Sequence, residues 1–209
     1  FAFSDNYDTF GQPLRQVALA VPRNRDYRVA AASGEPYLGT VTEMRYAVPG
    51  DEEQRYIVDR VAESTTHEIL NDGSRPLLAL YQAIQAGTAD RSANPIAQTC
   101  TYYDGEAFVG LPFGEIGDFG AEVRSESLVL TEQLRDEAYD SAPPYLLPDA
   151  AVAWSEEYPA QFRQMPELAG YAFADGNDHR ARGYFVQGTR TAYGFQIGSS
   201  VAGRGLPFA

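Results

Sequence analysis

The chain has no lysine, one cysteine, two histidines, two methionines and one tryptophan among its 209 residues. A single cysteine cannot form an internal disulfide, so no disulfide framework holds the fold. One cysteine and two distant histidines do not make a His/Cys zinc site. No apolar run approaches the ~18 residues that a membrane-spanning helix needs. The lone Cys100 lies in a strand-like run, and we interpret it as a small buried apolar residue.

Positive charge is also scarce. All 16 cationic side chains are arginines, against 29 Asp and Glu, which gives a net charge of −13. This balance argues against binding of a nucleic-acid backbone and of an anionic membrane surface. The hydrophobic fraction of 44% is enough for a packed core.

The chain starts at Phe1, and its first residues lack the basic and apolar regions of a signal peptide. The missing start Met and the glycine-rich tail of residues 203–209 lead us to expect that residues 1–209 are a single β-rich segment of a larger protein. The proline-rich run 141–148 is the expected position of a seam, although an ordered surface loop would have the same composition.

Apolar residues alternate with small or polar ones in much of the chain, which predicts half-buried strands. In the segment 14–21, for example, Val17, Leu19 and Val21 recur with a period of two. Further strands are predicted at 41–48, 55–62, 63–70, 97–103 and 123–130, where the last could also start a helix. Two hairpins are expected, one turning at Asp104-Gly105 toward 107–109, and one formed by 182–187 and 189–195 around Gly188.

Helical spacing is rarer. It is clearest after the Asn71-Asp72-Gly73 turn, where Ser74 is the predicted N-cap, Pro76 lies in the first turn and Gly87 follows the last turn. The apolar residues at helical spacing are Leu77, Leu80, Tyr81 and Ile84. Shorter helices are predicted at 131–139, capped by Thr131, and at 159–165. The predicted fold class is therefore mainly β with a few short helices.

Adjacent acidic residues invite a catalytic interpretation. A glycosidase needs two carboxylates about 5–9 Å apart across a cleft. Sequence neighbours point in different directions, so we interpret these acids as solvated surface: Asp51-Glu52-Glu53, Asp136-Glu137 and Glu156-Glu157. The serine clusters 125–127 and 199–200 lack a Gly-x-Ser-x-Gly elbow, and no phosphate-binding glycine loop follows a strand. Ser64-Thr65-Thr66 is not followed by the Glu-x-Glu of an ADP-ribosyltransferase.

Other side chains have both a functional and a packing interpretation. His67 fits a half-buried strand position, whereas His179 lies in a turn-like cluster where Asp175, Asn177 and Asp178 could bind Ca²⁺, although the terminal Glu of a full loop is missing. Aromatic residues could line a sugar platform, but we expect most of them to pack. These are Tyr102, Tyr103, Tyr145, Trp154, Tyr158, Tyr171, Phe173, Tyr184, Phe185, Tyr193 and Phe195. No catalytic, cofactor-binding or metal-binding residue is assigned.

Three stretches, in order, resemble one family. Residues 8–23, Asp-Thr-Phe-Gly-Gln-Pro-Leu-Arg-Gln-Val-Ala-Leu-Ala-Val-Pro-Arg, are similar to a segment of insecticidal toxin complex B components, which are Salmonella virulence plasmid B-like and RHS-type shell proteins. Residues 41–46 and 63–69 resemble the next strands of that family, and residues 98–105, 111–115 and 123–131 resemble the following block. The chain departs from the family pattern at 20–22, and no Asp-x-x-Gly-Asn repeat follows Phe195.

The resemblance implies a structural role in the middle region of such a protein. It implies antiparallel strands and hairpins of an RHS-like sheet that is incomplete without the remainder of the parent chain. The implied shell encloses a toxic effector polypeptide, in a secreted complex with C-like and A-like components. No nucleic acid, cofactor, catalytic residue or membrane insertion by this segment is implied. A carbohydrate- or surface-binding β module, and an enzyme with dispersed carboxylates, are the alternatives.

Overall fold

The computed structural model describes residues 1–30, 35–50, 56–131, 133–134, 171–194 and 207–208. Within them the protein is mainly antiparallel β-sheet with one helix described in full, which confirms the predicted fold class. The predicted seam at 141–148 and the predicted helix at 159–165 lie outside the described residues. The chain forms two compact units, residues 1–47 with 57–97 and residues 48–56 with 98–209. Each unit is considered by itself.

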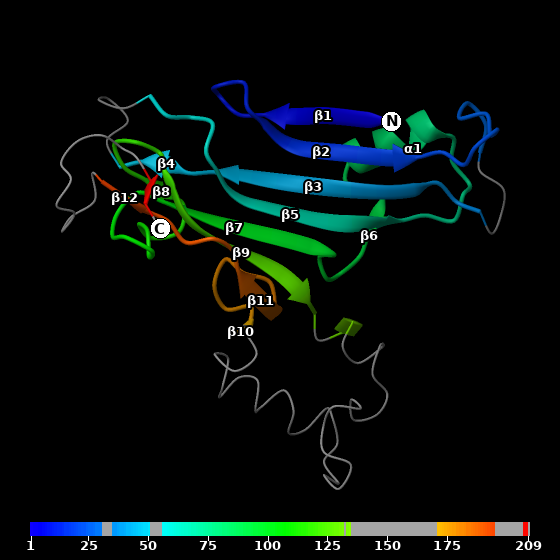
Figure 1. Ribbon diagram of the computed structural model, residues 1–209. Coiled ribbons are helices and arrows are strands. Elements are labelled where there is room, and N and C mark those ends of the chain that lie inside the picture. Colours follow the sequence, from blue (N-terminus) through cyan, green and yellow to red (C-terminus); the bar gives the residue numbers. More distant parts are fainter. Residues whose placement is uncertain (31–34, 51–55, 132, 135–170, 195–206, 209) are drawn as a thin grey trace, which may run out of the picture. The chain divides into compact units, whose positions relative to one another are not determined.

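The first unit is built on an antiparallel sheet with the strand order β1-β2-β3-β5 (Figure 1). Val17 lies opposite Val41 in the neighbouring strand, and Leu19 and Ile69 lie opposite Gly39 from its two sides, so the apolar positions of the strands are aligned. The strands are β1 (Ala2–Tyr7), β2 (Pro13–Ala20), β3 (Leu38–Tyr46) and β5 (Val61–Leu70), with the short β6 (Asp90–Arg91) paired to the end of β5.

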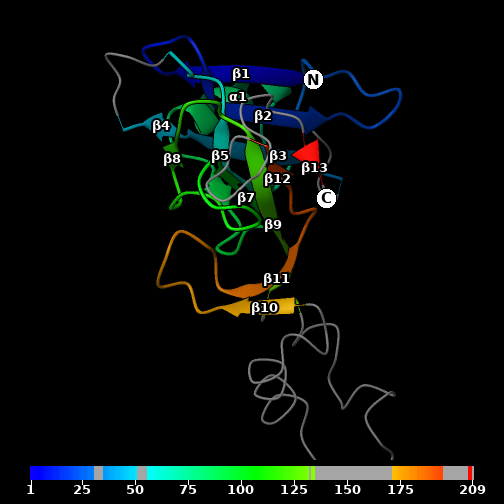
Figure 2. The same ribbon diagram turned by 60° about the vertical axis from the view of Figure 1, so that its left-hand side comes forward.

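One face of this sheet packs against α1 (Leu77–Gln85), which lies along β1 and β2 in Figures 1 and 2. Alternation places every second side chain of a strand on that face. The shared core consists of Val17, Leu19, Tyr37, Val41 and Ile69 from the sheet side and Leu77, Leu80 and Ile84 from the helix. The period-two and period-3.6 patterns of the sequence therefore meet in one core.

The ends of α1 differ in part from the prediction. Pro76 is the N-cap residue rather than a first-turn residue, and no side chain caps the helix. The Ser74 cap is wrong, because the Ser74 amide donates to the Asp72 carboxylate in a turn that ends before the helix begins. Gly87 has φ +67° and donates to the carbonyl of Ile84, as expected of a residue after the last turn.

The second unit contains a sheet with the order β7-β9-β11-β10 and two small pairs of strands. The sheet strands are β7 (Ala97–Tyr103), β9 (Glu122–Leu130), β11 (Gly183–Gln187) and β10 (Tyr171–Ala174), all antiparallel to their neighbours. The small pairs are β4 (Val48–Pro49) with β8 (Glu115–Ile116), which are parallel, and β12 (Ala192–Tyr193) with β13 (Pro207–Phe208).

Both predicted hairpins are wrong. No strand forms at 107–109; β7 pairs instead with β9, because the Asp104 carboxylate accepts amide hydrogen bonds from Gly117, Gly120 and Ala121 and so closes a long loop. β11 pairs with β9 and β10, and Gly188 donates to Ser125 rather than turning a hairpin.

Three other predictions are refined. In the described part of the segment 55–62 no separate strand forms, since residues 56–60 are not a strand and β5 begins at Val61. The segment 123–130 is a strand, β9, and not a helix start. The Thr131 hydroxyl accepts a hydrogen bond from the Leu134 amide at 3.1 Å, as a cap would, but most of the helix predicted there lies outside the described residues.

Gly39 tests how tightly the first unit is packed. A Cβ atom at this position would lie 2.8 Å from Leu19 Cδ2 and 3.1 Å from Ile69 Cβ. We expect Gly39→Ala to lower the free energy of unfolding by about 1–3 kcal/mol, because the core must shift to admit a methyl group. Urea denaturation measures this change.

Gly50→Ala is the matched control, because no atom lies within 4 Å of the position that its Cβ would take. Its free energy of unfolding is expected to stay within about 0.5 kcal/mol of the unsubstituted chain. Equal effects of the two substitutions would contradict the packing described for Gly39.

Candidate functional site

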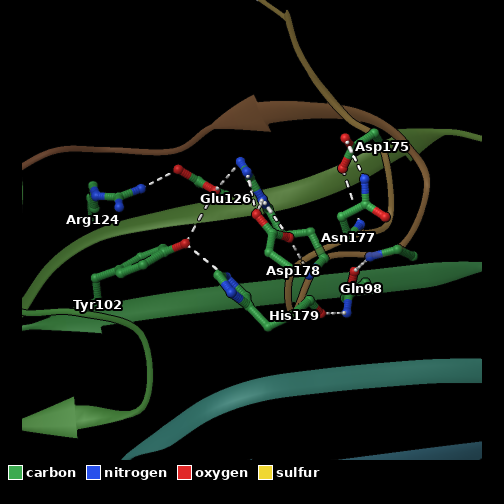
Figure 3. Close-up of polar contacts among 10 residues, drawn as sticks. Gln98, Tyr102, Arg124, Glu126, Asp175, Asn177, Asp178 and His179 are labelled. Atoms are coloured by element: carbon green, nitrogen blue, oxygen red, sulfur yellow. Dashed lines mark hydrogen bonds and ion pairs between the residues drawn. The ribbon is translucent and has the colours of Figure 1, made fainter.

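The second unit contains a polar cluster centred on Glu126, a residue of β9 that is 5% exposed (Figure 3). Its carboxylate contacts the guanidinium groups of Arg124 and Arg180 and the hydroxyl of Tyr102. A buried carboxylate is stable only when such partners replace the lost water. This cluster joins a buried carboxylate to two guanidinium groups and a phenol, so it is the candidate site.

The strand register brings three of these side chains together. Arg124 and Glu126 are two residues apart on β9 and therefore lie on the same face of the sheet. Tyr102 of β7 lies opposite Arg124, and the Arg124 guanidinium carbon is 3.4 Å from the centre of the Tyr102 ring. Arg124 also donates from Nε to the carbonyl of Val109 at 2.6 Å. Arg124 is thus held by a carboxylate, an aromatic face and a backbone oxygen.

The loop between β10 and β11 supplies the remaining groups. His179 Nε2 lies 2.9 Å from the Tyr102 hydroxyl, and the imidazole stacks on the Phe113 ring with 3.5 Å between ring centres. Gln98, which is 3% exposed, holds this loop: its amide nitrogen donates to the carbonyl of His179 at 3.0 Å, and its amide oxygen accepts from the Ala181 N–H at 2.7 Å. One buried glutamine therefore positions the histidine.

The electrostatics favour fixed charges and a neutral tyrosine. Burial, together with the negative charge of Glu126, raises the pKa of Tyr102 to about 12. A hydrogen bond from Arg180 lowers the pKa of Asp178, and the same bond raises the pKa of Arg180. Two carboxylates thus face two guanidinium groups, and Tyr102 stays protonated near neutral pH.

This arrangement is better suited to cross-linking than to catalysis. Both oxygens of the Glu126 carboxylate already accept contacts, one from Arg124 and the other from Arg180 and Tyr102. A general base needs an oxygen within reach of a substrate proton. The cluster instead ties β7 and β9 to the loop that precedes β11.

A second polar cluster ties the first unit together. The Asp5 carboxylate of β1 accepts hydrogen bonds from Arg15 of β2 at 2.5 Å, from the Tyr81 hydroxyl at 2.8 Å and from the Gln85 amide at 3.2 Å, both on α1. Burial opposes ionisation of Asp5, but the hydrogen bonds from Arg15, Tyr81 and Gln85 together outweigh it and lower the pKa of Asp5. Asp5 and its three hydrogen-bond donors all belong to the first unit. This favours a structural role for Asp5.

The structure places the residues that the sequence singled out as follows. Asp175 accepts hydrogen bonds from the backbone and side chain of Asn177, and Asp178 pairs with Arg180, so these oxygens are engaged with protein donors. Within the described ranges, no group of three or more His, Cys, Asp and Glu residues could hold a metal ion. The adjacent acids of 51–53, 136–137 and 156–157, and the serines of 199–200, lie outside the described residues.

The packing interpretations hold where the structure tests them. His67 is half-buried and its Nδ1 lies 2.9 Å from the carbonyl of Ser92, as a structural histidine does. Cys100 is fully buried. Among the described aromatic residues proposed for a platform, Tyr102, Tyr103, Tyr184 and Phe185 are buried, while Tyr171, Phe173 and Tyr193 are exposed or half-buried.

Sequence reasoning did not find the Glu126 cluster. Glu126 was noticed within Ser125-Glu126-Ser127 as a possible nucleophile region, and His179 as part of a calcium-like turn. The signal that was available is the Arg-x-Glu spacing of 124–126, which places opposite charges on one face of a strand. The pairing with Tyr102 depends on the β7–β9 register, which the sequence did not reveal.

No protein-family model matches the chain, and no curated protein matches it. In the described part of the chain, no helix is both long enough and apolar enough to cross a membrane.

The Glu126 cluster predicts a specific loss of stability. Glu126→Gln leaves the partly buried guanidinium of Arg124 without its carboxylate, and we expect the free energy of unfolding to fall by about 2–4 kcal/mol. Glu43→Gln is the matched control, since Glu43 forms a half-exposed ion pair with Arg91 and its loss is expected to cost less than about 1 kcal/mol. Equal losses in urea denaturation would show that Glu126 is not a buried cross-link.

The raised pKa of Tyr102 predicts that the stability of the fold changes at alkaline pH. Its pKa is about 12 in the folded chain and about 10 when unfolded, so the folded state binds the proton more tightly. The stabilising contribution is therefore complete below about pH 10 and is lost as the pH rises toward 12.

We expect the free energy of unfolding to decline less steeply over this range in Tyr102→Phe than in the unsubstituted chain. Denaturation at a series of pH values measures both slopes, and their difference isolates Tyr102 from the other tyrosines. Parallel slopes would contradict the pKa shift.

Proposed function

We propose that the chain is a non-enzymatic structural segment of a toxin-complex B-like protein, in which it forms part of the β-sheet shell around a toxic effector polypeptide. Under this proposal its partners are the remainder of the parent chain, C-like and A-like components and the enclosed effector. The complex is secreted by a bacterium. The basis of the proposal in the sequence is the ordered resemblance of residues 8–23, 41–46, 63–69, 98–105, 111–115 and 123–131.

The outer edge of β1 is the structural observation that carries the proposal. Phe1 and Leu19 exchange two backbone hydrogen bonds of 2.9 and 2.8 Å, which sets the phase of the β1–β2 ladder. Antiparallel ladders alternate, so the backbone groups of Ala2 and Ser4 point away from β2. Among the described residues, no strand pairs with this side of β1. A shell segment needs such an edge, because neighbouring parts of the parent continue the sheet.

The edge is partly shielded. The exposed Tyr7 hydroxyl donates to the carbonyl of Ser4 at 3.1 Å, whereas Ala2 and Ser4 are both exposed and small. Small side chains allow another strand to approach. β1 also contains no lysine or proline, the residues that commonly protect an edge strand.

The two alternatives have weaker support. A carbohydrate-binding module needs aromatic rings presented to solvent, yet most of the described candidate rings are buried. An enzyme with dispersed carboxylates needs two of them facing one cavity, yet the buried carboxylates of Asp104 and Glu126 are each saturated by protein donors. Neither the buried aromatic rings nor the buried carboxylates therefore favour a binding or catalytic role over a structural one.

The gene provides the first test. The reading frame that encodes this segment is expected to continue into RHS-type repeats on at least one side, and the purified parent is expected to form hollow particles in electron micrographs. A frame that ends near residue 209 without such repeats, or a parent protein that forms no closed particle, would overturn the proposal.

A substitution at the β1 edge provides the second test. Ser4→Pro removes the outward N–H, so we expect it to prevent shell closure in the parent while it changes the free energy of unfolding of the 209-residue chain by less than about 1 kcal/mol. Ser4→Ala keeps the N–H and is the control that should close normally. Closed particles formed equally well by Ser4→Pro would show that the edge is not used.

A further inference from the structure

The sheet of the first unit has a second face, opposite α1, that contains a shallow hollow of about 450 Å³. We call this surface the open face and define it by Ala18, Ala20, Leu38, Thr40, Glu68 and Ile96, which all line the hollow. The strand residues among them alternate with Leu19, Gly39 and Ile69, which belong to or border the α1 core. The open face is therefore the side of the sheet that α1 does not cover.

The open face has short side chains at its centre and large aliphatic side chains beside them. Ala18 and Ala20 have short side chains and are exposed. Leu38 is 67% exposed and Ile96 is 55% exposed, although both are large aliphatic residues. Exposed aliphatic side chains that line one hollow are typical of a surface that another molecule covers.

The strand register arranges these residues in two rows. Ala20 lies opposite Leu38, which makes an aliphatic row across β2 and β3. Ala18 lies opposite Thr40, and Thr40 lies opposite Glu68, which makes a second row that ends in a carboxylate. Successive rows on one face of a sheet are about 7 Å apart, the same spacing as residues i and i+2 of an extended chain.

Glu68 gives the open face its charge. Its backbone amide donates to the Ser92 hydroxyl, but within the described residues its carboxylate forms no ion pair. Among the described residues that line the hollow, Glu68 is the one with a charged side chain. A carboxylate beside exposed aliphatic groups favours an occupant that offers both a cation and an apolar side chain.

We propose that the open face binds an extended segment of a partner polypeptide, in which an aliphatic residue lies on the Ala20–Leu38 row and an arginine or lysine two residues away lies beside Glu68. A second copy of the chain is a poorer occupant, because each copy has a net charge of −13. A sugar is also a poorer occupant, because the residues that line the hollow include a single aromatic ring, that of Phe1, and few polar side chains. The inference does not depend on the proposed shell function.

Two synthetic peptides of identical composition test the proposal with the 209-residue chain. In the first, leucine and arginine alternate with serine, so that both face the same side when the peptide is extended. In the second, leucine and arginine are adjacent, so that they face opposite sides. Fluorescence anisotropy is expected to show saturable binding of the first peptide and at least about fivefold weaker binding of the second.

Substitutions locate the binding surface. We expect Leu38→Ser to weaken binding of the first peptide about tenfold and Glu68→Gln about threefold. The matched controls are Leu78→Ser, a leucine on α1 that is 53% exposed, and Glu43→Gln, a half-exposed acid of β3; both should bind as the unsubstituted chain does. The two acid substitutions remove the same charge, so a general attraction of basic peptides would affect them equally.

Hydrogen exchange with the unsubstituted chain provides a readout that needs no variant. Bound peptide is expected to protect residues 18–20, 38–40 and 66–70. The proposal is overturned by an absence of saturable binding, by equal affinity for the two peptides, or by equal effects of Glu68→Gln and Glu43→Gln. Concentration-dependent self-association that Leu38→Ser abolishes would also overturn it, because a second copy would then be the occupant.

Discussion

Burial of one sheet face against α1 is the constraint on which the first unit depends. Val17, Leu19, Val41 and Ile69 must all point toward the helix, and a slip of one residue in any strand would turn its apolar side chains away from it. The same constraint explains the glycine at position 39, because Leu19 and Ile69 close over the space that a side chain would take. One-sided burial also leaves the opposite face and the edge of β1 without a partner among the described residues.

Buried carboxylates have a comparable part in the second unit. Asp104 gathers three backbone amides and closes the loop between β7 and β9, and Glu126 connects those strands to the loop that carries His179. Burial of each carboxylate costs free energy, and it becomes favourable only when all of its hydrogen-bond donors are in place. Such groups define a unique arrangement of loops.

The charged groups of the described residues differ between the interior and the surface of each unit. The polar clusters of Asp5 and Glu126 are internally balanced, with carboxylates matched to arginines. The unbalanced features are on the outside: the backbone groups of the β1 edge and the Glu68 carboxylate beside the exposed Leu38. Both features offer contacts to an extended polypeptide, one through the backbone and the other through side chains.

The sequence by itself determined the local elements: the strand of 14–21 through its alternation, α1 through its apolar spacing, and the turn of 71–73 through its residue types. These properties depend on near neighbours in the chain. Tertiary structure decided which strands pair, so that β7 joins β9 and β11 joins β9 and β10 instead of forming the predicted hairpins. It also decided that Glu126, Tyr102 and His179 meet. Pairing between distant segments depends on total burial and hydrogen bonding, which no local pattern encodes.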